Sequence, residues 1–418
     1  MTAKSYSRWS TRLATTSLCL LFAAFWACNE DPTPSLYQPE NLNTLAAPVI
    51  ASIDPAGEAF AGIGIITING QNFSSAKSEV SVYFNDQAGE ILEASATQLR
   101  VKVPNLVSEN VSLKIAVNRV EKFSNTVNYK LVAAVAPVFK FAEIDEPWAI
   151  AVDAQDNIFA SLTSNSLGDG VKKITLAGAK TDFSPRLTGS VTRYQGLKVG
   201  PAGALYGVTF ERRIIQVPAA GGTSTNWVVL PNTAVRLNDL DFDRDGNLWT
   251  AGSLDLHRVR PDKNVKSFPF TGTIRAVRVY NGAVYLAGNR NSQEIVWRVP
   301  LISADQVGPE EEYFNFTSKY SGAIYAITFA ADGDLLIGTD APESIVSVSP
   351  SKNASVLYTG LFPSKCFNFA WGTGNFLYAT QEKKTVVEGT TTRLVEPQTI
   401  LSINMLKKGA PYYGRGDQ

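Results

Sequence analysis

Residues 240–249 read Leu-Asp-Phe-Asp-Arg-Asp-Gly-Asn-Leu-Trp. Apolar and polar side chains alternate at the start of this stretch, a turn rich in Asp, Gly and Asn follows, and apolar residues resume at Leu248. Alternation with a period of two is typical of a half-buried β-strand, and Gly and Asn adopt the backbone conformations that tight turns need. The stretch therefore predicts a β-hairpin.

The same strand–turn–strand pattern recurs with a period of about 44 residues, and repetition at such a period governs the interpretation of the whole region. Each copy has an apolar first strand, a turn built from Gly, Asn or Asp, and a second strand with an aromatic or aliphatic residue near its start. Six copies are present, at residues 149–160, 196–206, 239–249, 276–285, 326–337 and 368–378.

A third strand follows every one of these hairpins. The six segments are residues 173–174, 214–217, 256–259, 295–299, 345–348 and 400–403. A unit of this kind cannot bury both faces of its sheet alone, so the units must pack radially around a common axis. The repeats predict a six-bladed β-propeller over residues 138–418.

The last blade is short of an outer strand, because Gly409-Ala410-Pro411 makes another regular strand unfavourable. Residues 138–141 read Val-Phe-Lys-Phe, lie just before the first blade and have strand alternation. We therefore expect residues 138–141 to pair with residues 400–405. Such pairing closes the ring and removes an exposed sheet edge.

Ahead of the repeats, residues 47–132 show short apolar alternations separated by turns rich in Pro and Gly. Strands are expected at residues 49–53, 65–70, 80–84, 99–103 and 111–117. Antiparallel strands of this length, with frequent turns, are typical of an immunoglobulin-like β-sandwich. The chain is therefore expected to be all-β, with a sandwich followed by a propeller.

Turn and strand residues of the sandwich together carry a family resemblance. They occur in the order Pro48…Ser52-Ile53-x-Pro55…Gly64…Thr67-Ile68-x-Gly70-x-Asn72-Phe73…Val82-x-Phe84…Thr97-Gln98-Leu99…Val103-Pro104…Ser124-Asn125. With these residues, the segment 47–132 resembles an IPT/TIG domain over its whole length. The resemblance implies a spacer or interaction module that has no catalytic residues.

The repeat region resembles NHL-type propellers in the segments 147–153 and 240–249. A longer string, Arg236-x-Asn238-Asp239-x-x-x-Asp243-x-x-Gly246-x-x-Trp249, is similar to a segment of the gluconolactonase/senescence-marker-protein family, whose members are six-bladed metal-dependent lactonases. That likeness implies an Asn near a substrate. The other blades must also supply a Glu, an Asn and an Asp to one axial metal, and no convincing set stands at the starts of their inner strands. The propeller fold therefore transfers more readily than the function.

The first 27 residues have the order of a targeting segment, in which three basic residues precede an apolar run over residues 18–27. Phe25-Trp26-Ala27-Cys28 resembles a bacterial lipobox, which implies that Cys28 is acylated and becomes the mature N-terminus. Residues 28–46, rich in Pro, Asn and acidic side chains, are then a flexible tether. An ordinary secretory peptide with an incidental cysteine is the alternative.

Composition excludes several classes of function. The 38 basic residues balance the 38 acidic ones, which argues against a nucleic-acid partner bound through phosphate neutralisation. His257 is the only histidine, so a zinc site with several His and Cys ligands is excluded. We expect His257 to be a partly exposed sheet residue and Cys366 to be a buried small apolar side chain.

One segment imitates the opening of a calcium loop, Asp241-x-Asp243-x-Asp245-Gly246. The twelfth position of such a loop is Gly252 here, where calcium coordination requires a bidentate Glu, and the flanking segments are strands. A turn within a blade is the preferred interpretation. We assign no catalytic residue, no metal ligand and no cofactor, and calcium alone stays open.

A candidate ligand site follows from the repeat. Equivalent positions in a propeller are related by near-rotation about the axis, so the residues at the starts of the inner strands are expected to surround the axial mouth. Of these six residues, three have aromatic side chains and three have side chains that form hydrogen bonds. This mixture suits stacking on a sugar ring and hydrogen bonds with the sugar hydroxyls. Simple plugging of the channel is the alternative. The six residues are Trp148, Gln195, Asn238, Arg275, Tyr325 and Phe367.

A tethered TIG domain that carries a propeller resembles the cell-surface lipoproteins of Bacteroidota, which often accompany polysaccharide-uptake machinery. The resemblance implies a cell-envelope protein, held at the outer membrane by an N-terminal lipid and exposed at the surface. The first hypothesis is therefore non-catalytic binding of a glycan at the axial mouth. A metal-dependent lactonase-like hydrolase or lyase and a protein–protein scaffold of an envelope complex are the two alternatives.

Overall fold

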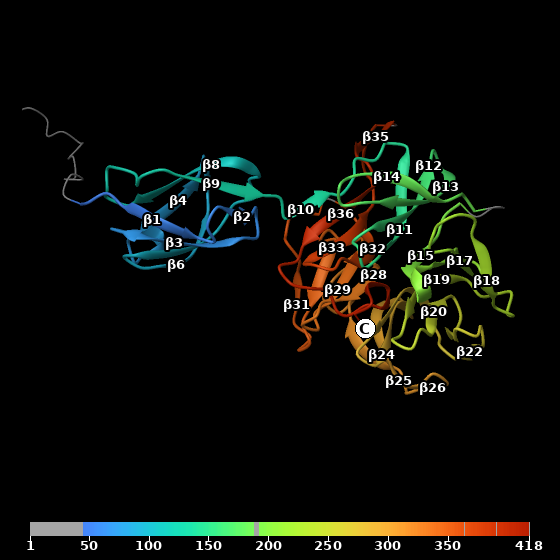
Figure 1. Ribbon diagram of the computed structural model, residues 1–418. Coiled ribbons are helices and arrows are strands. Elements are labelled where there is room, and N and C mark those ends of the chain that lie inside the picture. The colour runs from blue at the N-terminus through green and yellow to red at the C-terminus, as the bar shows by residue number, and fades with distance from the viewer. Residues whose placement is uncertain (1–44, 188–191, 363, 390, 418) are drawn as a thin grey trace, which may run out of the picture. The chain divides into compact units, whose positions relative to one another are not determined.

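The computed structural model describes residues 45–187, 192–362, 364–389 and 391–417. Its elements are β-strands with a few short 3-10 turns, and the chain divides into two compact units (Figure 1). The expected signal segment 1–27, Cys28 and all but the last two residues of the expected tether lie outside the described residues. Within the described part, no helix has the length and apolar composition that a membrane crossing requires.

The N-terminal unit is a sandwich of two antiparallel sheets. One has the order β1-β3-β7-β6 and the other the order β2-β9-β8-β4-β5. The strands are β1 (Val49–Asp54), β2 (Glu58–Phe60), β3 (Ile65–Gln71), β4 (Val80–Phe84), β5 (Gln87–Ala88), β6 (Glu90–Ala94), β7 (Gln98–Lys102), β8 (Ser108–Val117) and β9 (Val127–Val132).

Alternate residues of the sandwich strands form its core. Ile66 and Ile68 of β3 are fully buried, and so are Leu113 and Ile115 of β8, while the residues between them are partly or fully exposed. This period of two places one face of each strand against the other sheet. Gly70 has a local reason, because a Cβ there would overlap the carbonyl oxygen of Val49 on the neighbouring strand.

The second unit contains six four-stranded blades, which confirms the all-β class of sandwich plus six-bladed propeller. Blades one to three are β11 (Asp145–Val152), β12 (Ile158–Ser164), β13 (Leu167–Ile174) and β14 (Lys180–Ser184); β15 (Gly196–Val199), β16 (Leu205–Val208), β17 (Arg213–Val217) and β18 (Thr225–Val229); and β19 (Leu237–Phe242), β20 (Leu248–Gly252), β21 (Leu256–Val259) and β22 (Val265–Phe268).

Blades four to six follow the same order. They are β23 (Thr273–Tyr280), β24 (Ala283–Arg290), β25 (Gln293–Ser303) and β27 (Glu311–Asn315), with β26 (Gln306–Val307) on the end of β25; β28 (Ile324–Phe329), β29 (Leu335–Thr339), β30 (Ile345–Val348) and β31 (Ala354–Val356); and β32 (Cys366–Trp371), β33 (Phe376–Gln381), β36 (Thr399–Asn404) and β10 (Val135–Pro137). A separate hairpin, β34 (Lys384–Glu388) and β35 (Thr391–Glu396), is inserted between β33 and β36.

The ring closes through blade six, but with a different strand from the one expected. β10 pairs antiparallel with β36, so that Val135 opposes Ile403 and Pro137 opposes Leu401. The closing strand therefore begins three residues before the expected segment 138–141, of which only the Val138 amide joins the ladder, donating to the Ile400 carbonyl at 2.9 Å. The alternation of residues 138–141 instead reflects packing, because Phe141 is buried among apolar residues of blades one and six.

The segment that imitates a calcium loop is the turn between β19 and β20. The Asp243 carboxylate accepts hydrogen bonds from the amides of Asp245 and Asn247, from the Asn247 side chain and from the Trp249 indole, at 2.9–3.2 Å. Both carboxylate oxygens therefore bind protein donors. Blade one has the same turn, in which Asp153 accepts from the amides of Gln155 and Asn157 at 2.9 Å.

Candidate functional site

The six residues expected at the axial mouth, called the mouth ring below, all begin inner strands and are half-buried. Five lie within β-bulges, where the pairing register shifts between the first and second strands of the blade. In blade two, the Gln195 amide donates to Val208, which also opposes Gly196. A bulge re-aims the side chain of its extra residue. The mouth ring is therefore a repeated backbone feature: Trp148, Gln195, Asn238, Arg275, Tyr325 and Phe367.

Contacts between blades join most of the mouth ring. The Asn238 amide group donates to the Ile274 carbonyl of the next blade at 2.6 Å, and Arg275 Nε donates to the Ile324 carbonyl at 2.5 Å. The rings of Trp148 and Phe367 have centroids 5.5 Å apart across the junction of blades one and six. These contacts run between adjacent blades at the starts of the inner strands.

Cations cover the aromatic members of the mouth ring. The Arg193 guanidinium lies 3.5 Å from the centroid of Trp148. Lys365 Nζ lies 4.4 Å from the centroid of Tyr325 and 5.7 Å from that of Phe367. Such cation–π contacts hold positive charge beside the aromatic residues of the mouth ring. One face of the Trp148 ring is therefore occupied by Arg193.

Two carboxylates near the mouth ring are paired with cations. Glu294 binds Arg275, and Glu382 lies 2.9 Å from Lys365. Arg193 forms no ion pair with a described residue, and its partial burial lowers the pKa of the guanidinium. The Gln195 side chain makes no hydrogen bond within the described part of the chain. Arg193 and Gln195 therefore have side-chain polar groups without a hydrogen-bond partner among the described residues.

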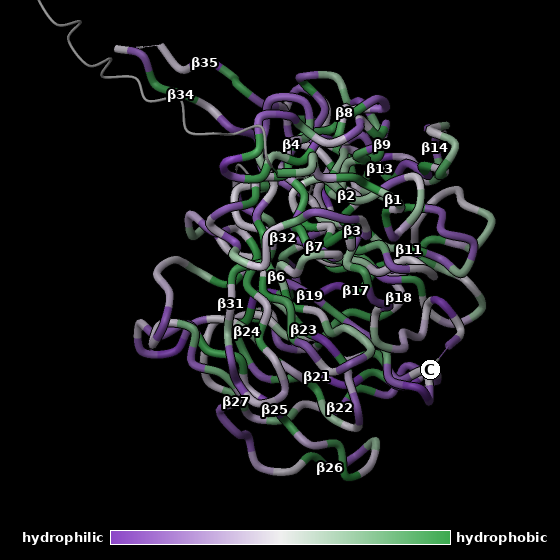
Figure 2. Tube along the Cα trace, turned by 90° about the vertical axis from the view of Figure 1, so that its left-hand side faces the viewer, coloured by the Kyte–Doolittle hydropathy of each residue, from purple (hydrophilic) through white to green (hydrophobic). Residues whose placement is uncertain are grey.

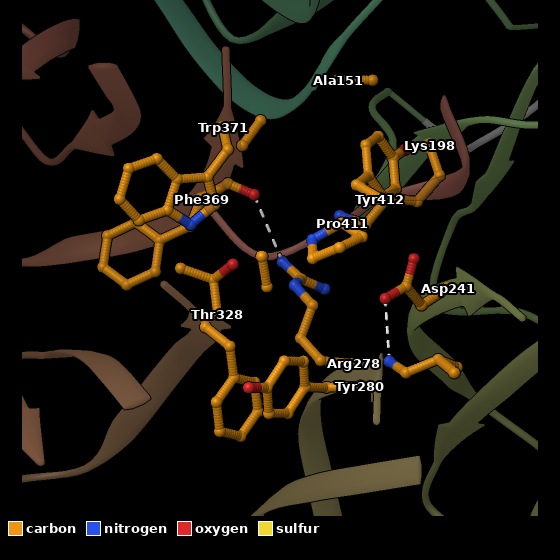
Figure 3. A pocket seen from close by; sticks show the side chains of 14 residues that line it. Ala151, Lys198, Asp241, Arg278, Tyr280, Thr328, Phe369, Trp371, Pro411 and Tyr412 are labelled. Carbon is orange, nitrogen blue, oxygen red and sulfur yellow. Dashed lines mark hydrogen bonds between the residues drawn. The ribbon is translucent and has the colours of Figure 1, made fainter. Parts of the chain in front are cut away.

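A second ring of equivalent residues lies three positions further along the same strands. It lines a cavity of about 40 Å³, which Figure 3 shows from close by. We call these residues the inner ring: Ala151, Lys198, Asp241, Arg278, Thr328 and Ala370. The volume accommodates a few water molecules and is too small for a sugar. Sequence reasoning missed this ring, although its signal is present as single charged residues inside apolar strands.

Buried charges of the inner ring are linked by hydrogen bonds. Arg278 donates to the Asp239 carboxylate at 2.8 Å and to the Phe369 carbonyl at 3.2 Å. The Asp241 carboxylate accepts from the amides of Phe242 and Val279, each at 2.9 Å. These bonds connect the inner strands of blades three, four and six. Charges removed from water are tolerated only when such partners compensate them.

Lys198 differs from its neighbours, because its ammonium group forms no ion pair or hydrogen bond with a described residue. The residue is 3% exposed. Burial, reinforced by the positive charge of Arg278, lowers the pKa of Lys198 to about 8, although Asp239 and Asp241 oppose the shift. Burial also raises the pKa of Asp241. Desolvation thus favours the neutral form of both groups.

The segment after β36, called the C-terminal segment below, closes the other end of the channel. The Ala410 amide donates to the Phe329 carbonyl at 3.0 Å, and the Tyr412 hydroxyl accepts from the Val199 amide at 3.1 Å. Both partners end inner strands, whereas the mouth ring begins them. Arg415, which is buried, donates to the Gly372 carbonyl at 2.6 Å. The C-terminal segment therefore covers the end of the channel that lies opposite the mouth ring.

Other residues singled out from the sequence have structural partners. In the lactonase-like string, Asn238 binds a neighbouring blade, Asp239 binds Arg278 and Asp243 holds a turn. Among the described residues, no group of three or more His, Cys, Asp and Glu side chains is arranged to hold a metal ion.

The histidine and the cysteine are both buried. His257 is 3% exposed, so the expectation of partial exposure is wrong. Its ring nitrogens lie 2.8 Å from Ser267 Oγ and 3.1 Å from the Leu254 carbonyl, and burial lowers the pKa of the imidazole. The contact with Ser267 explains the burial, because a polar side chain loses less on leaving water when it keeps a hydrogen bond. Cys366 is fully buried as expected, and burial raises the pKa of its thiol.

In the sandwich, the side chains of Ser124 and Asn125 form hydrogen bonds with the backbone of other strands. The Asn125 side chain binds the backbone of Ile50 twice, accepting from its amide at 2.8 Å and donating to its carbonyl at 3.1 Å. The Ser124 hydroxyl accepts from the Ile115 amide at 2.9 Å. Residues 48–131 match the model of the IPT/TIG domain. The resemblance of this segment to a TIG domain is therefore confirmed.

The TIG domain has little aromatic surface. Tyr83 and Phe123 form an edge-to-face pair with centroids 6.2 Å apart, and Phe123 is exposed. A single exposed aromatic residue is normal on a protein surface. Among the described residues, the TIG domain therefore has no cluster of exposed aromatic side chains.

Solved structures with the propeller fold resemble much of the chain. A luciferin-regenerating enzyme is 16% identical, with a TM-score of 0.51, over 67% of this chain and 98% of that one. A putative gluconolactonase is 15% identical, with a TM-score of 0.50, over 66% and 94%. An auxiliary nutrient binding protein from Bacteroides thetaiotaomicron is 11% identical, with a TM-score of 0.47, over 80% and 95%. The similarity to the luciferin-regenerating enzyme and to the putative gluconolactonase shows the fold alone. No curated protein sequence matches the chain.

Proposed function

We propose that this protein is a non-catalytic binding protein whose propeller takes a glycan at the mouth ring, with the TIG domain as a spacer. One observation supports the proposal: six equivalent positions at the starts of the inner strands, five of them at a bulge, carry three aromatic and three polar side chains. Sugars are bound by stacking on aromatic faces and by hydrogen bonds to their hydroxyls.

The charges at the mouth favour a glycan that carries carboxylate or sulfate groups. Arg193 and Lys365 lie on aromatic faces, and only Lys365 has a carboxylate in ion-pair contact among the described residues. A guanidinium binds a planar carboxylate with two parallel hydrogen bonds. We therefore expect acidic polysaccharides to bind more tightly than neutral ones of the same linkage.

The test uses the protein without residues 1–27 and with Cys28→Ser, screened by thermal shift against soluble neutral and acidic polysaccharides. A ligand that binds the folded state raises the melting temperature. Binding constants of the hits are then measured by calorimetry for the unaltered protein and for Trp148→Ala. A matched control is Trp227→Ala, because Trp227 is also half-buried but lies on β18, the outer strand of blade two.

We expect Trp148→Ala to weaken binding and Trp227→Ala to leave it unchanged. Equal loss in both variants, or no loss in either, contradicts a site at the mouth ring. A panel without a single hit contradicts the glycan assignment.

The same proposal includes a lipid anchor at Cys28 and a place in the cell envelope, at the outer membrane. Two or more acyl chains hold a protein firmly, because each buried methylene contributes about 0.8 kcal/mol. Cys28→Ala is therefore expected to release the protein from the membrane fraction after cell lysis. Unchanged fractionation contradicts the anchor and leaves the glycan site untouched.

A further inference from the structure

The β34–β35 hairpin is a separate two-stranded sheet, joined to neither neighbouring blade by strand pairing. It projects from the propeller (Figure 2). Its apolar side chains are exposed: Val387 at 69%, Val395 at 40% and Val386 at 38%. Each strand pairs with the other along one edge only, so each keeps one free edge among the described residues.

A hairpin of this kind lacks the additional strand or packing partner that usually stabilises a sheet. An isolated two-stranded hairpin is marginally stable in water, and a free edge with apolar side chains is a template for another strand. Proteins commonly protect such edges with charges, Pro or bulges. The distribution of these features differs between the two edges of this hairpin.

The edge of β35 is blunted. Pro397 follows Glu396 directly, and a proline has no amide hydrogen to donate to a neighbouring strand. Arg393, in the middle of β35, is directed to its own hairpin, where its guanidinium lies 3.5 Å from the Glu388 carboxylate. β34 has no proline, and its charges stand only at its two ends.

The sequence of β34 is complementary to itself. It reads Lys384-Thr385-Val386-Val387-Glu388. When two copies of this strand lie antiparallel about a twofold axis at Val386, Lys384 of each copy opposes Glu388 of the other. Val386 then opposes its own equivalent, and Thr385 opposes Val387. Opposite charges across a strand pair are favourable and like charges are unfavourable.

We propose that β34 is a self-association edge, through which two copies of this chain form one four-stranded antiparallel sheet. The contact is isologous, so every interaction occurs twice. Five residues on each strand form a contact well below the roughly 1,200 Å² of stable interfaces, so the dimer is weak and reversible.

The test is charge exchange on the protein without residues 1–27 and with Cys28→Ser, measured by sedimentation equilibrium over micromolar to near-millimolar concentration. Lys384→Glu places Glu opposite Glu388, and Glu388→Lys places Lys opposite Lys384. Each single change is expected to lower the association constant about tenfold or more. The double variant Lys384→Glu/Glu388→Lys restores opposite charges, and an equimolar mixture of the two single variants associates more strongly than either alone.

Thr392→Lys on β35 is the matched control, because it adds a charge to the blunted edge opposite the uncharged Val387 of β34 and is expected to leave association unchanged. Unaltered melting temperatures establish that the variants remain folded. A strictly monomeric unaltered protein overturns the proposal, as do single variants that associate like the parent or a double variant that stays as weak as the singles. Loss of association in Thr392→Lys alone assigns the contact to β35 and also overturns it.

Discussion

The mouth ring and the inner ring come from the same six strands, three residues apart, yet their environments are opposite. Mouth-ring side chains are half-buried at the starts of the strands, and the Gln195 amide group has no hydrogen-bond partner among the described residues. Inner-ring charges are almost fully buried beneath the C-terminal segment, where Arg278 is paired with Asp239, Asp241 accepts from backbone amides, and Lys198 has no ion pair with a described residue. Under the proposed function, one repeated strand serves recognition at its start and stability near its end.

The largest expected effect tests the stability of the inner ring. Arg278→Ala leaves the Asp239 carboxylate buried without its 2.8 Å partner, and breaking a buried pair in this way costs about 3–5 kcal/mol. Urea unfolding measures the loss. Arg244→Ala, at an exposed turn position, is the control. A loss below about 1 kcal/mol for Arg278→Ala means that the inner ring does not hold the blades together.

A somewhat smaller effect concerns the pH dependence of Lys198. Its pKa of about 8 in the folded protein lies below its ordinary value of 10.5, so the unfolded state binds more protons between these values. The cost of burying the ammonium is about 3 kcal/mol below pH 8 and disappears as the pH rises to 10.5. Lys198→Met lacks this cost, because its side chain carries no charge.

The gain in unfolding free energy of Lys198→Met over the parent is therefore expected to be largest below pH 8 and to vanish near pH 10.5. Denaturant titrations at several pH values measure it. If the difference in unfolding free energy between Lys198→Met and the parent does not depend on pH, Lys198 titrates normally and is well solvated. The contrast between the mouth ring and the inner ring then no longer holds.

The smallest effect separates binding from stability at the mouth ring. Gln195→Ala removes a side chain without hydrogen bonds to described residues, so unfolding free energy is expected to change by less than about 0.5 kcal/mol. Glycan binding is expected to weaken by about 0.5–1.5 kcal/mol. Arg275→Ala, in contrast, is expected to reduce both quantities, because Arg275 also binds Glu294 and the Ile324 carbonyl. Calorimetry and urea unfolding on the same preparations compare them.

The repeat of the sequence was sufficient to predict the blades, because hairpin turns and apolar strands recur in a fixed order. It was insufficient for the ring closure, where the alternation of residues 138–141 serves packing and the ladder uses Val135–Pro137 instead. Pattern alone does not separate an apolar face that packs from one that pairs.

The inner ring escaped prediction for a related reason. Lys198, Asp241 and Arg278 differ in charge and size, so no common residue type marks their position in the repeat. Aligning the six inner strands by their bulges places all three at one level, and charges at one level of a propeller axis must compensate one another. The partners themselves, such as the Phe369 carbonyl that binds Arg278, depend on tertiary contacts that a single sequence does not reveal.

The late position of the closing strands constrains how this chain reaches its native state during synthesis. β10 finds its partner only when β36 has left the ribosome, and the Tyr412 hydroxyl binds Val199 across 213 residues of chain. β10 must therefore wait unpaired, and the side of blade one that packs against blade six stays exposed, while the rest is made. Contacts of such long sequence separation slow folding and prolong the time in which unpaired strands are exposed. A chaperone that shields β11 and β15 during this interval would raise the yield of closed rings more than one that acts after release.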